Sequence, residues 1–284
     1  MPSTKEIITK IKSIQNTQKI TRAMEMVAAS KMKKSQEKMK ASRPYSIRIR
    51  EVISNAAQGK LEYKHSYVKN RDMKNVGYLV ITTDRGLCGG LNVNLFKAVL
   101  LSMSEYSKKN VNVKISIIGK KGVTFFSKFC GNIISIKTGV GDNINSQDFV
   151  GVVKVMLDLY DNLFIDKLYI AYNEFVNTMI QVPKLYQLIP VLTISTNKTY
   201  WDYIYEPSSE FLIDELFNRY IESLVYQSVV ENSACEQAAR MVAMKSASDN
   251  AKEIVSKCKL IYNKFRQASI TQEISEIVGG AAAV

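Results

Sequence analysis

The stretch that decides the fold is residues 208–278, SSEFLIDELFNRYIESLVYQSVVENSACEQAARMVAMKSASDNAKEIVSKCKLIYNKFRQASITQEISEIV, which contain neither Gly nor Pro. Pro207 stands before this stretch and Gly279-Gly280 after it. These are a start signal and a stop signal for a helix. One helix of 71 residues would be about 105 Å long, far more than the width of a globule of this size. We therefore predict one long helix, much of which projects.

Small and apolar residues recur along this stretch at the spacing of a coiled coil. An alanine seam comes first and lets another backbone approach closely. A comb with a 4-3-4-3-4 spacing follows it, and such a stripe needs a partner helix. The seam is Ala234, Ala238, Ala239, Ala243, Ala247 and Ala251, and the comb is Ile254, Cys258, Ile261, Phe265, Ala268 and Gln272.

The other end of the chain supplies the partner, since residues 3–43 also lack Gly and Pro. Ser3 and Glu6 have the spacing of a capping box, which predicts a helix start there. We expect Pro44 to kink or interrupt this helix, after which the pattern resumes to about Gly59. The comb of this helix has a polar middle and runs through Ile7, Ile11, Ile14, Gln18, Thr21, Glu25, Ala28, Met32, Ser35 and Met39.

Between the two helices the periodicity changes to that of alternating strands and helices. Strands are predicted at 78–82, 113–118, 133–136, 168–172 and 185–192. Helices are predicted at about 92–108, in a short segment that ends at Phe129, and at about 147–163. This alternation is typical of an α/β unit with a largely parallel, doubly wound sheet. The predicted organisation is a shaft helix at 1–58, a connector at 59–75, an α/β (Rossmann-like) domain at 76–200 and a second shaft helix at 208–284.

The charge is strongly positive and uneven. The 284 residues carry a formal net charge of +13, and residues 1–55 hold 13 Lys or Arg against 4 Asp or Glu. A chain with this excess of positive charge is expected to bind an acidic partner. A basic coiled coil that binds nucleic acid is one alternative, but no aromatic residue occurs from Met1 to Pro44. No apolar run is long enough to span a bilayer.

A glycine-rich turn after the first predicted strand raises a second alternative, a nucleotide-using enzyme. Gly86, Gly89 and Gly90 fit neither of the phosphate-binding motifs GxGxxG and GxxxxGK[ST], so a tight structural turn is the better interpretation. Cys88 lies in this turn without a neighbouring base and is interpreted as a buried thiol. His65 is the only histidine. We predict no catalytic, cofactor-binding or metal-binding residues.

Three stretches resemble the γ subunits of F-type ATP synthases. They are IKSIQNTQKITRAMEMVAASKM at 11–32, TDRGLCGGLN at 83–92 and the segment 231–284, which includes EQAARM at 236–241 and QASITQEI at 267–274. The resemblance covers the whole chain. It implies an antiparallel coiled coil of the two terminal helices, with the α/β domain inserted between them.

The resemblance also implies a function. Members of this family form the central shaft inside an α3β3 hexamer and catalyse nothing themselves. Their rotation with the c-subunit ring couples proton flow to ATP synthesis at the three β sites and, in reverse, to hydrolysis. The implied partners are α, β, ε and the c-ring, with no nucleic acid and no cofactor. No presequence precedes Met1, so the expected location is peripheral, at the cytoplasmic face of a bacterial inner membrane.

Residue roles follow from the same resemblance. The implied contacts with the β subunits are Met24, Arg240, Arg266, Gln267 and Thr271. The implied residues that face the c-ring and ε are Tyr203, Tyr205 and Glu206. By spacing alone, Gln267 and Thr271 would be polar residues on a helix surface.

Overall fold

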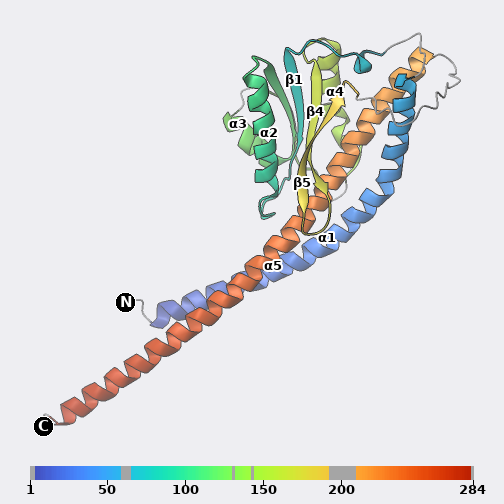
Figure 1. Cartoon of the computed structure of the whole chain (residues 1–284). Coiled ribbons are helices and arrows are strands. Elements are labelled where there is room, and N and C mark those ends of the chain that lie inside the picture. Colours follow the sequence, from blue (N-terminus) through green and yellow to red (C-terminus); the bar gives the residue numbers. More distant parts are fainter. Residues whose placement is uncertain (1–3, 59–64, 130–131, 142–143, 192–208, 283–284) are drawn as a thin grey trace. The chain divides into compact units, whose positions relative to one another are not determined.

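The computed structural model describes residues 4–58, 65–129, 132–141, 144–191 and 209–282. The two long helices are α1 (Thr4–Gln58) and α5 (Ser209–Ala282), and the other described elements lie between them in the sequence. The chain forms two compact units (Figure 1), one of Met1–Ala29 with Arg240–Val284 and one of Ser30–Ala239. We call them the helical unit and the α/β unit.

The α/β unit is built on a five-stranded sheet with the order β3-β2-β1-β4-β5. The strands β1 to β4 pair in parallel, whereas β5 runs antiparallel to β4. This arrangement confirms the predicted largely parallel sheet. The strands are β1 (Asn75–Ile81), β2 (Asn112–Ile118), β3 (Ile133–Lys137), β4 (Lys167–Phe175) and β5 (Gln181–Ile189).

Helices cover both faces of this sheet, because the chain crosses from β3 at one edge back to β4 beside β1. The helices α2 (Leu91–Ser107) and α3 (Lys120–Phe129) pack on one face, where Phe96 and Phe126 join the core. The helix α4 (Gln147–Asp161) packs on the other face, together with the parts of α1 and α5 that belong to the α/β unit. The doubly wound architecture is therefore confirmed (Figure 1).

The central strand β1 shows why the sequence signal was strong. Its residues NVGYLVI are buried except at Asn75, because both faces of a parallel sheet are covered. Tyr78 and Val80 face the core shared with α2, whereas Leu79 and Ile81 face the core shared with α4 and α5. A continuous apolar run is thus the pattern of a strand with two buried faces.

Two helix boundaries differ from the prediction. We expected Pro44 to kink or interrupt the helix; α1 continues through it, so the interruption is wrong, whereas the kink stays a prediction. Pro44 is exposed, and solvent can therefore bind the Lys40 carbonyl that loses its partner. The helix α5 likewise runs past Gly279-Gly280 to Ala282, because two exposed glycines weaken a helix without forbidding it. Ser3 and Pro207 lie outside the described residues.

Among the described residues, no helix combines the length and the hydropathy needed to cross a membrane.

Candidate subunit-contact surface

The helical unit consists of an antiparallel helix pair, with both chain termini towards one end (Figure 1). Its α1 segment confirms the predicted comb, because every comb member in this unit is buried or half-buried. Ile7 and Ala28, at the two ends of the comb, are 7% and 1% exposed. The half-buried members between them are Ile11, Ile14, Gln18, Thr21 and Glu25.

Four of the six residues of the comb predicted on α5, Ile254, Ile261, Ala268 and Gln272, are exposed, so this part of the prediction is wrong. Between residues 251 and 265 the observed seam is displaced from the predicted comb by one residue at two positions. Val255 is buried and Tyr262 half-buried, whereas the predicted members Ile254 and Ile261 are 45% and 48% exposed. From Ala251, a step of three reaches Ile254 and a step of four reaches Val255. Both are apolar, so spacing could not separate them. The observed seam is Met244, Ser248, Ala251, Val255, Cys258, Tyr262 and Phe265.

A second set of apolar side chains in the helical unit is exposed, both beside the seam and on the end of α5 after Phe265, where every residue from 266 to 281 is exposed. Monomeric soluble proteins rarely expose large apolar patches, and such patches mark contacts with other proteins. We call this set the outer apolar surface. Its members are Ile20, Met24, Met26 and Val27 on α1, and Ile254, Leu260, Ile261, Ile270, Ile274, Ile277 and Val278 on α5.

The residues that the family resemblance assigned to β contacts all lie in the helical unit. Met24 belongs to the outer apolar surface and is 37% exposed. Arg266, Gln267 and Thr271 are exposed on α5, and the Thr271 hydroxyl donates to the Gln267 carbonyl at 2.9 Å. Arg240 differs, because it is buried.

Their contacts with another subunit stay a prediction. Tyr203, Tyr205 and Glu206, assigned to the c-ring and ε, lie outside the described residues.

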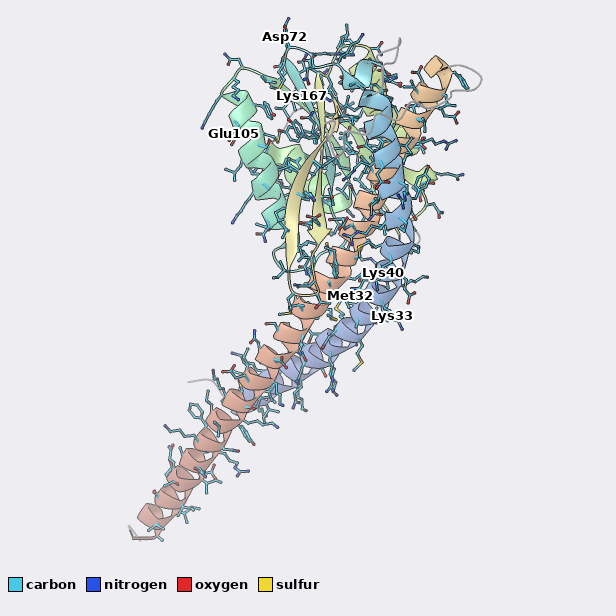
Figure 2. The ribbon with its side chains drawn as sticks, turned by 45° about the vertical axis from the view of Figure 1, so that its right-hand side comes forward. Met32, Lys33, Lys40, Asp72, Glu105 and Lys167 are labelled. Carbon is cyan, nitrogen blue, oxygen red and sulfur yellow. The ribbon has the colours of Figure 1, made fainter. Side chains whose placement is uncertain are left out.

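Basic side chains continue along α1 in the α/β unit. Lys33 and Lys40 are exposed there (Figure 2), close in sequence to the half-buried Met32. The helical unit contains 12 Lys or Arg residues and 6 Asp or Glu residues. The surface of both helices is therefore suited to an acidic partner.

The side chains of the glycine-rich turn at residues 83–92 contact one another and α5. Asn92 is buried and its Nδ2 donates to Thr83 Oγ1 at 2.8 Å and to Cys88 Sγ at 3.4 Å. Cys88 and Leu91 form a small core with Cys235 of α5. The interpretation of Cys88 as a buried thiol is thus confirmed, and the turn has the packing of a structural element.

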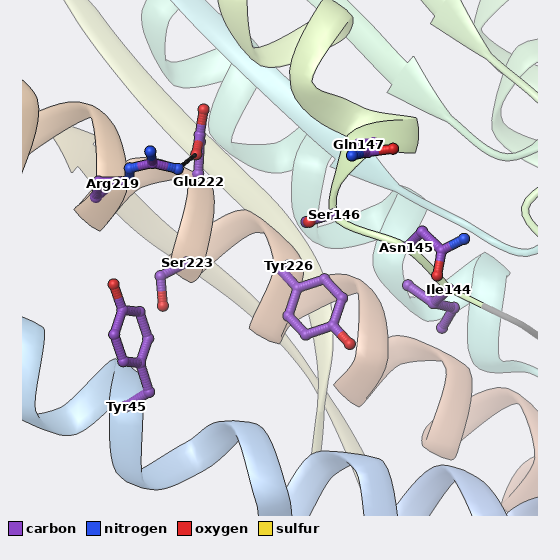
Figure 3. Close-up of a pocket in the computed structure, with 9 residues that line it drawn as sticks. All are labelled: Tyr45, Ile144, Asn145, Ser146, Gln147, Arg219, Glu222, Ser223 and Tyr226. Carbon is purple, nitrogen blue, oxygen red and sulfur yellow. Dashed lines mark ion pairs between the residues drawn. The ribbon is translucent and has the colours of Figure 1, made fainter.

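An open cavity of about 580 Å³ lies in the α/β unit between α1, α5 and the start of α4 (Figure 3). Its charged side chains are paired: Arg219 contacts Glu222 at 3.7 Å and Glu215 at 3.7 Å. The Ser223 hydroxyl lies 3.3 Å from that of Ser46 on α1. Among the described residues that line this cavity, no nucleophile lies next to a base.

His65 contacts α5 within the α/β unit. Its ring stacks on Phe217 of α5 with centroids 4.7 Å apart, and its Nε2 lies 3.0 Å from Asp214 Oδ1. Its Nδ1 accepts from the Tyr67 amide at 3.1 Å. Burial lowers the pKa of His65, against the opposing effect of Asp214 and Asp161.

Comparisons with known proteins match this architecture. A family model described as ATP synthase matches residues 3–284. A chain of the Tetrahymena thermophila mitochondrial ATP synthase central stalk and c-ring is 26% identical, with a TM-score of 0.60 over 81% of this chain and 99% of that one.

Two structures of the Euglena gracilis mitochondrial ATP synthase share the fold. A rotor chain in rotational state 1 is 19% identical, with a TM-score of 0.69 over 94% of this chain and 98% of that one. A chain of the OSCP/F1/c-ring assembly in rotational state 3 is 21% identical, with a TM-score of 0.71 over 99% of this chain and 94% of that one. Because the family model spans nearly all of the sequence, this chain belongs to the family of ATP synthase γ subunits, the non-catalytic central-stalk subunits of the F1 sector.

Proposed function

We propose that this chain is the rotor shaft that couples proton-driven rotation of a c-subunit ring to the cycling of three catalytic β sites. The helical unit turns inside an α3β3 hexamer, and the α/β unit binds ε and the c-ring. The direction of coupling reverses when ATP is hydrolysed, because linkage between two equilibria is reciprocal.

The observation that carries this proposal is the outer apolar surface of the helical unit. Val255 is buried in the seam between the two helices, whereas the adjacent Ile254 is 45% exposed. A sleeve formed by α and β subunits covers these side chains in the assembled complex. The apolar surface without many fixed polar contacts also suits a shaft that must rotate, because apolar contact is non-directional.

The contacts with β are proposed at Met24, Arg266, Gln267 and Thr271, which are exposed, and at Arg240. The foot that meets the c-ring and ε is proposed at Tyr203, Tyr205 and Glu206. The proposed domain limits are 1–58, 59–75, 76–200 and 208–284. The proposed site of action is the cytoplasmic face of a bacterial inner membrane, where the chain is held through the membrane sector.

Purification of tagged chain from membranes tests this function. We expect α, β, ε and c subunits to co-purify with it in fixed proportion, and ATP to drive proton uptake into vesicles that carry the complex. Titration of the isolated chain with ATP is expected to show no tight site. Tight ATP binding to the isolated chain, with no co-purifying α and β, would instead support the nucleotide-using enzyme.

A further inference from the structure

Three side chains from two consecutive turns of α5 are hydrogen-bonded to the end of strand β4. The Phe175 amide donates to Glu231 Oε1 at 3.2 Å, and Asn173 Nδ2 donates to Asn232 Oδ1 at 2.9 Å. The Cys235 thiol donates to the Asn173 carbonyl at 3.2 Å. All three α5 residues are almost completely buried. We call this set of contacts the α5–β4 joint.

We propose that the α5–β4 joint is the register lock that makes the sheet and the α5 segment packed on it, within the α/β unit, one torque-bearing body. Glu231, Asn232 and Cys235 act as positioning residues in this role. The inference rests on the proposed rotor function, because a register lock matters for function only if torque passes through this chain.

The apolar core alone does not fix the axial position of α5 on the sheet. The core between α5 and β4 contains Ile221, Leu224 and Val225 against Leu168 and Ile170. Apolar contact is proportional to buried area and has no preferred direction, so it resists separation better than it resists sliding. A twisting load needs contacts that are lost as soon as the helix moves.

The joint has this property because its groups are buried. If α5 slid along β4, the amides of Asn173 and Phe175 would lose their acceptors without gaining water. An unpaired buried polar group is much more unfavourable than an exchanged surface contact. Sliding of α5 would therefore break three buried hydrogen bonds at once, and each loss would raise the free energy of the displaced state.

Polar contacts continue from α5 to α1 within the same unit. The Ser42 hydroxyl donates to Gln227 Oε1 at 2.5 Å, and the hydroxyls of Ser46 and Ser223 are 3.3 Å apart. Gln227 lies one helical turn before Glu231. The sheet, α5 and α1 are thus connected in series by directional contacts.

The chemistry of Glu231 identifies the informative substitution. Burial raises the pKa of its carboxyl above the ordinary value, while the Phe175 amide and the nearby Arg43 act in the opposite direction. A glutamine keeps the shape and the accepting oxygen without a charge. Glu231→Gln is therefore expected to preserve the joint, whereas Glu231→Ala removes the acceptor.

The experiment uses the complete ATP synthase in membrane vesicles. For each variant, ATP hydrolysis and ATP-driven proton uptake are measured together, subunit proportions are checked, and hydrogen exchange is followed at the Phe175 amide. We expect Glu231→Ala to exchange roughly five-fold faster there, the factor that corresponds to one lost hydrogen bond of about 1 kcal/mol. We also expect its ratio of protons taken up to ATP hydrolysed to fall, with hydrolysis retained. Glu231→Gln is expected to match the wild type in both.

A second pair of variants covers the case in which Glu231→Ala does not assemble. Cys235→Ala removes the donor to Asn173, whereas Cys235→Ser keeps a donor, and the same difference in coupling ratio is expected between them. An unchanged ratio in an assembled alanine variant with faster exchange overturns the inference. An equal loss in Glu231→Gln and Glu231→Ala also overturns it, because charge rather than register would then matter. A wild-type complex that takes up no protons with ATP contradicts the rotor function itself.

Discussion

Adjacent residues on α5 make the most discriminating test of the helical unit. Val255 is 7% exposed and faces the seam, whereas Ile254 is 45% exposed and faces outwards. Val255→Ala removes two buried carbon groups. At about 0.8 kcal/mol each, the loss is about 1.5 kcal/mol, before any further penalty for the cavity.

Ile254→Ala is the matched control on the same turn of the same helix. In the isolated chain we expect it to change stability by less than about 0.5 kcal/mol, because its side chain is half-exposed and alanine favours the helix. In the proposed complex, α and β subunits cover the remaining apolar area. The loss there is about 1 kcal/mol, or roughly five-fold weaker association with α and β.

Native-state hydrogen exchange of the isolated chain measures the first effect, since it reports the local opening of the helix pair. We expect the amides of residues 248–262 to exchange roughly ten-fold faster in Val255→Ala and nearly unchanged in Ile254→Ala. Titration with purified α and β subunits measures the second effect. The reasoning fails if Ile254→Ala accelerates exchange as much as Val255→Ala does, because Ile254 would then belong to the seam.

Three further outcomes are expected. Gly119→Ala should destabilise the α/β unit by at least about 2 kcal/mol in urea unfolding, because φ is +104° and a Cβ atom would lie 2.3 Å from the Thr82 carbonyl oxygen. Gly141→Ala, whose Cβ atom would meet no atom within 4 Å, should change stability by less than about 0.5 kcal/mol. The lowered pKa of His65 means that the unfolded chain binds its proton first as pH falls, so stability should drop below about pH 6.5. Urea midpoints at about pH 7.5 and pH 5.5 measure this drop, and His65→Gln should reduce it. Met24→Lys should place an ammonium near acidic β groups at some rotor angles only, where a net gain of about 1 to 2 kcal/mol would lower proton uptake more than ATP hydrolysis. Equal losses of uptake and hydrolysis would contradict that reasoning.

The strands and helices of the α/β unit could be predicted from local sequence because their signals are unambiguous. The run YLVI in β1 is apolar throughout, and the chain returns to polar turn residues on both sides. The long helices were equally clear, since neither Gly nor Pro interrupts residues 3–43 or 208–278. Antiparallel pairing of β5 with β4 required the structure, because a local pattern does not give strand direction.

The errors arose where a local rule competes with the surroundings. A proline inside a helix removes one hydrogen bond, and its ring crowds the carbonyl four residues earlier. At the exposed Pro44 solvent can bind the freed carbonyl, and α1 continues. Gly279-Gly280 ends a helix only if the next residues favour another conformation, and Ala281-Ala282 favours the helix. These features depend on context that spacing alone does not carry.

The candidate contact surface was only partly predictable. The α1 comb from Ile7 to Ala28 could be read from its spacing, whereas the choice between Ile254 and Val255 could not. The α5–β4 joint left no sequence signal, because Asn173 and Asn232 lie 59 positions apart. Single polar residues in apolar stretches become informative only when the fold shows which of them meet.

Observation of rotation tests the central claim most directly. The complex is immobilised through its β subunits, a visible probe is attached to the α/β domain of this chain, and the probe is followed while ATP is hydrolysed. The rotor function predicts turning in one direction, with three pauses per turn, one for each β site. A probe that stays fixed or turns in both directions during steady ATP hydrolysis by the same molecules would contradict it.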